Sequence, residues 1–224
     1  MIRILIISIL TLCFTINEIN GENPEHGWFK TPDTTILMPK KWDIPEKHHP
    51  PLQEIVPDVQ SLHDQRITVK YAHIGTTMNA RPTIWSLIFR NRDNRHYIIR
   101  VNKNEEFEGV QYNPDIPMES RIGLWIHELM HIKDYNDRGF FGVLERGWQY
   151  LSKRGRAKFE YEIDMMVIEA GYRYYLYRWA YYVLYDSNAS DDYKQYKRDV
   201  YLTPEEILGD MDELGYVHIP LFFF

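Results

Sequence analysis

The order of secondary-structure patterns along this sequence predicts an α+β fold, because strand patterns come first and helical patterns follow. Strand-like runs lie before residue 102, and helical patterns dominate the chain after residue 117. The 224 residues are 44% apolar and 26% charged, which is usual for globular proteins and excludes disorder or fibrous repeats as whole-chain descriptions. We expect a small N-terminal antiparallel sheet, followed by a buried helix and a helical C-terminal part.

The first twenty residues have the pattern of a secretory signal peptide. Arg3 precedes a mostly apolar run, residues 4–16, which is shorter than the roughly 20 residues that span a bilayer. We therefore expect residues 1–20 to direct export, giving a secreted or periplasmic protein. An uncleaved anchor in the cell envelope is the alternative, whereas Leu12 argues against a lipoprotein signal built on Cys13. No other stretch of the sequence is apolar enough to span a membrane.

Residues 21–60 are rich in proline, since most of the 12 prolines of the chain fall in this segment. Proline interrupts helices and cannot pair within an inner strand. We expect an extended arm on the surface or a loose linker here, which leaves residues 61–224 for the main domain.

The strand patterns follow this arm. Residues 67–74 read as one strand, and the runs 83–89 and 96–101 flank a polar cluster of Asn, Asp and Arg. Such a cluster between two β-rich runs predicts a hairpin. Two X-Pro pairs, ending at Pro114 and Pro117, then mark a loop ahead of the first long helix.

Four helices are expected in the second half of the chain. The first, residues 118–135, is apolar on several sides, which indicates a buried helix. Two more cover 142–153 and 156–185. The last begins after Thr203, where Pro204 suits the first helical position and Glu206 completes a capping box.

Composition limits the chemistry that this protein can perform. A net charge of −6 argues against non-specific nucleic-acid binding, which depends on a basic surface. The single cysteine, Cys13, lies in the signal-like run, so the rest of the chain has no thiol for a disulfide, a metal or a nucleophile. His, carboxylate and hydroxyl groups remain as the sources of chemistry.

The strongest motif is H-E-x-x-H at residues 127–131, on the helix expected to be buried. Residues four apart on a helix share one face, so His127 and His131 can bind the same metal ion. Glu128 can then lie beside a metal-bound water as a general base for hydrolysis. The alternative is a pair of structural histidines bonded to carbonyl groups, but burying two imidazoles and a carboxylate without partners is costly.

A hydrolytic zinc site usually needs a third protein ligand and leaves one position for water. The extended pattern with a later Gly and His fails here, because Asp134 and Asp137 occupy those positions, and the only later histidine is His218. A carboxylate is left. Glu160 and Glu162 on the third helix are the candidates, and their spacing lets only one of them face a given point.

The H-E-x-x-H helix followed by a second helix with an E-x-E-x-D string resembles the gluzincin metallopeptidases, notably their small soluble members. That resemblance implies a zincin-like domain over 61–224 with zinc bound by His127, His131 and Glu160. It also implies Glu128 as the general base and Asp164 as the group that holds a ligating imidazole by its other nitrogen.

The expected function is therefore that of an exported zinc-dependent peptidase, acting on a peptide or protein substrate with a metal-activated water. A non-catalytic surface or structural protein that binds zinc is the alternative. A di-iron site is a third reading, because residues 128–131 also form E-x-x-H, but Glu160, Glu162 and Glu169 lack the His three residues later that a second such motif needs.

Two further features of such a peptidase have candidates in the sequence. The strand 96–101 is the candidate edge strand for pairing with an extended substrate, although an ordinary inner strand fits equally well. A donor to the oxyanion is also expected. Nothing in the sequence selects among the candidates, which are Tyr135, Tyr161, Tyr172, Arg154 and Arg156.

Overall fold

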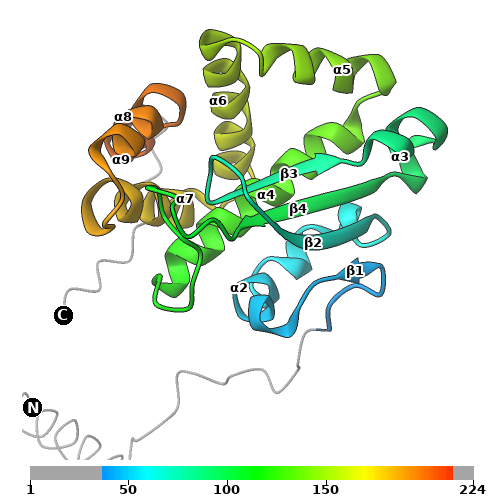
Figure 1. Cartoon of the computed structure of the whole chain (residues 1–224), viewed down its shortest axis with the longest axis horizontal. Helices are drawn as coiled ribbons and strands as arrows, with labels where there is room; N and C mark the ends of the chain where they lie inside the picture. The colour runs from blue at the N-terminus through cyan, green and yellow to red at the C-terminus, as the bar shows by residue number, and fades with distance from the viewer. Residues whose placement is uncertain (1–36, 214–224) are drawn as a thin grey trace, which may run out of the picture. The chain divides into compact units, whose positions relative to one another are not determined.

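A four-stranded mixed sheet packs against a long buried helix in the computed structural model, which describes residues 37–213 (Figure 1). The expected signal peptide, the start of the proline-rich segment and His218 lie outside these residues. The strands follow the order β1-β2-β4-β3 across the sheet. Their bounds are β1 Trp42–Asp43, β2 Arg66–Ala72, β3 Met78–Pro82 and β4 His96–Asn102.

The antiparallel sheet that we expected is wrong in its strand directions. Strand β2 runs parallel to both β1 and β4, and only β3 pairs antiparallel, with β4. The run 83–89, expected as a hairpin strand, is instead the helix α3, Ile84–Phe89. Thr83 caps this helix by accepting a hydrogen bond from the backbone N–H of Ser86, and such a cap favours helix over strand. The antiparallel partner of β4 is therefore the preceding segment, β3.

The proline-rich segment is neither a loose linker nor a surface arm from Trp42 onward. Trp42 and Ile44 are buried, and the short helical turns that follow contribute Leu52 and Ile55, each fully buried. Proline is accommodated because it stands at the first positions of these turns, where a helix needs no N–H donor. The turns are η1 Glu46–His48, α2 His49–Gln53, η2 Val56–Asp58 and η3 Gln60–Leu62.

The rest of the described chain is helical. The buried helix expected at 118–135 is confirmed as α4, and the expected 142–153 corresponds in part to α5. The single helix expected at 156–185 is wrong, because Gly171 interrupts it with a φ of 88° that favours glycine. Helix α8 had no counterpart in the sequence prediction. The bounds are α4 Met118–Asp137, α5 Phe140–Gln149, α6 Lys153–Glu169, α7 Arg173–Tyr181, η5 Tyr182–Asp186, α8 Asp191–Val200 and α9 Pro204–Glu213, with a short turn η4 Arg92–Asn94 before β4.

The capping box predicted for the last helix is confirmed. The backbone N–H of Thr203 donates to the Glu206 carboxylate at 2.8 Å, and the Glu206 N–H donates to the Thr203 hydroxyl at 3.3 Å. None of the described helices combines the length and the apolar character that a membrane crossing needs.

Helix α4 is the centre of the core. It contacts β3 on one side and α6, α7 and α2 on others, so most of its residues are buried (Figure 1). At Gly123 the backbones of α4 and α7 approach so closely that a Cβ atom would collide with the carbonyl group of Tyr175. The residues of H-E-x-x-H therefore lie at the point where sheet and helices meet.

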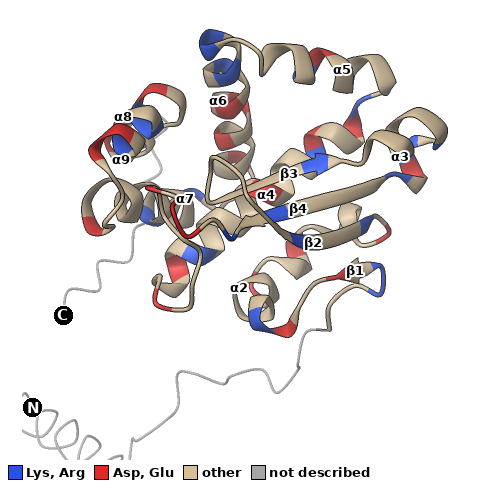
Figure 2. Cartoon of the chain, viewed as in Figure 1, with Lys and Arg blue, Asp and Glu red and all other residues tan. Residues whose placement is uncertain are grey.

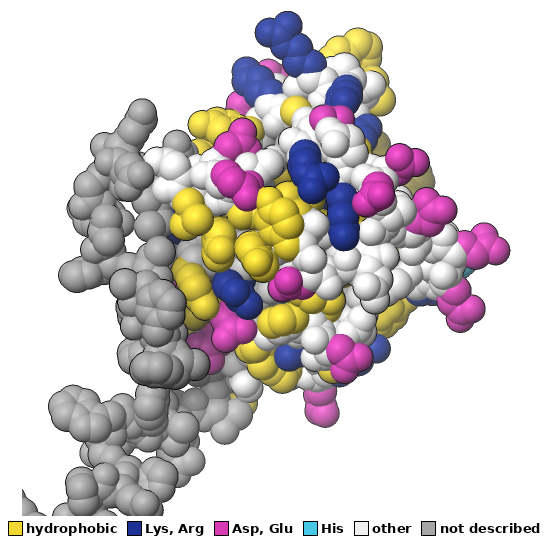
Figure 3. Space-filling view, turned by 90° about the vertical axis from the view of Figure 1, so that its left-hand side faces the viewer, with side chains coloured by type: hydrophobic (Ala, Val, Ile, Leu, Met, Phe, Trp, Pro, Cys, Tyr) yellow, Lys and Arg dark blue, Asp and Glu magenta, His cyan; other side chains and the backbone are white. Residues whose placement is uncertain are grey.

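The tyrosine-rich run that forms α7 and η5 contributes to packing. Trp179 and Val183 join the core, whereas Tyr174 and Tyr185 are exposed. Figure 3 shows the face on this side of the molecule, where hydrophobic side chains gather beside Lys and Arg side chains.

Candidate metal centre

Three buried side chains from two helices converge on one point. The Nε2 atoms of His127 and His131 on α4 lie 3.1 Å apart. The Oε2 atom of Glu160 on α6 lies 3.2 Å from the first and 3.1 Å from the second. His127 and His131 are each 5% exposed, and Glu160 is fully buried. Within the described residues these three form the group that could hold a metal ion.

The distances within this group fit a divalent ion. Ligand atoms at about 2.0–2.1 Å from a tetrahedral ion lie about 3.3 Å from each other, close to all three observed separations. Hydrogen bonding alone leaves the group incomplete, because Glu160 Oε2 and His131 Nδ1 have no hydrogen-bond partner among residues 37–213. A cation at this point would accept lone pairs from all three converging atoms.

Glu160 is held so that one carboxylate oxygen faces the imidazoles. Its other oxygen, Oε1, accepts a hydrogen bond from the Tyr150 hydroxyl at 2.7 Å. Burial and the charge of Glu160 raise the pKa of Tyr150 far above its usual range, so the phenol stays protonated and donates. Tyr150 lies at the C-terminal end of α5, and nothing in the sequence pattern marked it as part of the site.

Asp164 is the hydrogen-bonding neighbour of His127. The Nδ1 atom of His127 lies 2.8 Å from Asp164 Oδ1, and Asp164 Oδ2 accepts the backbone N–H of Leu202 at 3.1 Å. A proton on Nδ1 leaves the lone pair of Nε2 pointing at the convergence point. In the ion-free protein burial lowers the pKa of His127, but its bonds to Asp164 and Glu160 outweigh burial and raise that pKa to about 10.

Glu128 is placed beside the group but not within it. Its side chain is buried, and burial raises its pKa above the usual carboxylate range against the lowering effect of the two histidines. Glu128 and His127 line a small cavity of about 40 Å³ whose other walls are mostly apolar. A carboxylate with a raised pKa, whose Oε2 has no hydrogen-bond partner in the described part of the chain, can accept and return a proton.

Helix α8 and the residue that follows it complete the surroundings of the centre. The ring of Tyr201 lies 5.7 Å from that of His127, and the Lys197 ammonium lies 3.8 Å from the Tyr201 ring centroid. Both residues line the same small cavity as Glu128. The sequence offered no motif for them, because they come from a helix that we did not predict.

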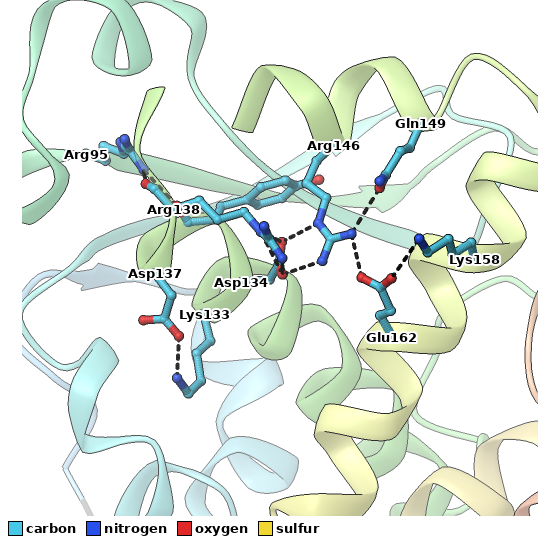
Figure 4. Close-up of polar contacts among 10 residues, drawn as sticks. Arg95, Lys133, Asp134, Asp137, Arg138, Arg146, Gln149, Lys158 and Glu162 are labelled. Atoms are coloured by element: carbon cyan, nitrogen blue, oxygen red, sulfur yellow. Dashed lines mark hydrogen bonds and ion pairs between the residues drawn. The ribbon is translucent and has the colours of Figure 1, made fainter. Parts of the chain in front are cut away.

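Glu162, the alternative third ligand, lies outside the group. It points to the other side of α6, where its carboxylate pairs with Arg146 at 2.6 Å and with Lys158 at 3.9 Å (Figure 4). Asp134 and Asp137 also belong to ion pairs rather than to the centre, with Arg146 and Lys133 respectively.

Of the two alternatives for residues 96–101, an edge strand or an inner strand, the structure has the inner strand. Strand β4 lies between β2 and β3, so its backbone groups are paired on both sides. The edge next to α4 is β3, which among the strands of residues 37–213 pairs only with β4. The edge strand is β3, Met78–Pro82, rather than the run 83–89, which forms α3.

The candidate oxyanion donors lie in different surroundings. Tyr161 and Arg154 are exposed, and Tyr172 donates to Asp58 at 2.6 Å. Tyr135 stacks on His131 with ring centroids 6.3 Å apart. Arg156 lies in a cleft next to Tyr150.

Comparison with models of protein families, with curated proteins and with solved structures gave no match for this chain. The geometry of the centre is therefore what indicates a function.

Proposed function

We propose that this protein is a zinc-dependent peptidase with a zincin-like, gluzincin-type catalytic domain. The observation that carries the proposal is the approach of Glu160 Oε2 to both imidazole Nε2 atoms within 3.2 Å, in a buried site. Two His and one Glu are the ligand set of hydrolytic zinc enzymes, which keep the fourth position open. The di-iron reading lacks support, because only these three residues form a metal-binding group in the described part of the chain.

Each buried group has a role in this proposal. Zinc at the three ligands would supply Lewis-acid activation of a water molecule and of the peptide carbonyl. Glu128 takes the proton of the attacking water and returns it to the leaving amine. Tyr150 fixes the carboxylate of Glu160, and Asp164 keeps His127 in the tautomer that presents Nε2.

The substrate class follows from the sheet edge beside the centre. Strand β3 has unpaired backbone groups along one side, and it contacts α4, which carries Glu128. An extended peptide can add to such an edge as a further strand, which would hold its scissile bond over the centre. The signal-like N-terminus adds the expectation that the enzyme acts in a secreted or periplasmic setting.

The test is Glu128→Gln in the zinc-loaded protein. We expect unchanged zinc content and a loss of peptide cleavage of about 10²–10⁴-fold, since the general base is removed while the ligands stay. Cleavage of a mixed peptide library is followed by mass spectrometry, with Glu145→Gln on exposed α5 as the matched control. Full activity in Glu128→Gln would contradict the mechanism. Zinc binding by a wild-type protein that cleaves nothing would favour the non-catalytic alternative.

A further inference from the structure

A second cleft, of about 530 Å³, opens beside the metal centre. Tyr150 joins the two, because its hydroxyl group donates to Glu160 while its side chain forms part of the cleft wall. The sheet contributes Asn79 and Arg100, the start of α6 contributes Arg156, and α8 contributes Tyr193 and Tyr196. None of the described residues that line this cleft is an Asp or a Glu.

The cleft contains two guanidinium groups that have no ion-pair partner among the described residues. Arg100 and Arg156 form no ion pair there, whereas Arg138 and Arg146 both pair with Asp134. Figure 2 shows basic positions on β4 and at the start of α6, the two elements that carry these arginines. Half-burying two cations without a direct ion pair is costly, which points to an anionic ligand.

Hydrogen bonds position both guanidinium groups, and each group keeps N–H donors that these bonds do not use. Arg156 lies 4.9 Å from the ring centroid of Tyr150, and it donates to the Tyr150 carbonyl at 3.1 Å and to the Tyr196 hydroxyl at 3.5 Å. Its Nε atom is buried without a partner among residues 37–213. Arg100 donates through Nε to Asn79 at 2.8 Å. Its two terminal nitrogens make no hydrogen bond within the same residues, so they remain available to a ligand.

We propose that this cleft is a subsite for a carboxylate of the bound peptide, with Arg156 and Arg100 as the residues that recognise it. The inference rests on the proposed function, because the peptide is the substrate which that function supplies. Guanidinium groups match carboxylates in charge and in planar, two-point geometry. The carboxylate comes either from an Asp or Glu side chain or from the C-terminus of the peptide, and the experiment separates the two.

The experiment measures binding to the zinc-loaded Glu128→Gln protein, so that it does not depend on turnover. Three fluorescently labelled peptides of one backbone sequence serve as probes in anisotropy titrations. One has a Glu side chain and an amidated C-terminus, one has Gln and a free C-terminus, and one has Gln and an amidated C-terminus. We expect one of the first two to bind about 10–100-fold more tightly than the third, as charged hydrogen bonds allow.

Variants of the cleft then identify the residues. Arg156→Gln and Arg100→Gln should each remove most of that preference and leave the affinity of the uncharged peptide unchanged. Arg156→Lys should keep part of it, since charge remains without the planar fork. Arg154→Gln, on the exposed surface two residues away, is the matched control. Zinc content and thermal unfolding establish that each variant is folded.

The outcomes separate this inference from the proposed function. Equal binding of all three peptides, or a preference that survives in the Arg100→Gln/Arg156→Gln double variant, overturns the carboxylate subsite even if the wild type cleaves peptides. An arginine-dependent preference in a protein whose wild type cleaves none supports the subsite and contradicts the peptidase.

Discussion

Two buried polar clusters lie about one turn apart on α4, and they differ in how completely their atoms are satisfied. In the first, the two oxygens of Asp134 receive hydrogen bonds from Arg146 at 2.8 and 3.0 Å and from Arg138 at 3.0 Å. Arg146 also bonds to Glu162 and Gln149 (Figure 4). In the second, His127, His131 and Glu160 face one another and leave polar atoms without hydrogen-bond partners in the described chain.

This difference separates a structural cluster from a binding site. The Asp134 cluster brings acidic and basic groups together, so its charges compensate each other without a ligand. The histidine cluster brings together lone pairs, which repel unless a proton or a cation lies between them. Burial alone therefore does not identify the site. What identifies it is the kind of atom that remains unpaired.

The largest effect is expected for Asp134→Ala. Arg146 is 4% exposed, so removing its main partner leaves a buried cation with incomplete pairing and should lower the free energy of unfolding by about 3–5 kcal/mol. Urea denaturation measures this loss. Lys133→Ala, in the exposed pair with Asp137, is the control and should cost about 1 kcal/mol or less. Equal effects of the two variants would show that the Asp134 cluster is not a structural unit.

The second-largest effect is expected for zinc affinity. Glu160→Gln should weaken zinc binding by more than about 100-fold, since losing a ligand costs more than losing a group that only orients one. Glu162→Gln, two residues away and paired with Arg146, should leave zinc affinity unchanged. Competition with a chromogenic chelator measures both. Chelation should also lower the melting temperature of the wild type but not that of Glu160→Gln. If Glu162→Gln weakened zinc binding and Glu160→Gln did not, Glu162 would be the ligand.

The sequence predicted the pair His127 and His131 because its geometry is local, since residues four apart share a helical face. Spacing on the second helix showed only that one of Glu160 and Glu162 can face the pair, and the resemblance to gluzincins favoured Glu160. The same locality explains why β2, β4, α4 and the Thr203 capping box were predicted, since each has its pattern within one short segment.

Features that depend on packing were not predictable in this way. The hydrophobic run 83–89 suits a strand by composition, but Thr83 begins a helix there, with Trp85 and Phe89 exposed. The parallel pairing of β2 with β4 and the position of Tyr150 beside Glu160 join segments far apart in the chain. Arg156 was a candidate oxyanion donor in the sequence, and only its surroundings indicate a carboxylate subsite.

The smallest expected effect is the pH dependence of the contribution that Asp134 makes to the free energy of unfolding. Burial raises the pKa of Asp134, but hydrogen bonds and charges from Arg146 and Arg138 outweigh burial and hold that pKa below its usual value. The folded protein therefore binds this proton less readily than the unfolded chain. The stabilising contribution of Asp134 is complete above about pH 4, the unfolded pKa, and is lost as pH falls through the folded pKa.

We therefore expect the difference in unfolding free energy between wild type and Asp134→Asn to be constant near neutral pH and to shrink below about pH 4. Asparagine keeps the shape of the side chain and one carbonyl acceptor, so this variant isolates the charge. Urea denaturation at a series of pH values measures the difference. A difference that stays constant into strong acid would mean that Asp134 acts through its shape and its hydrogen bonds. The ion pairs of the Asp134 cluster would then contribute little to stability.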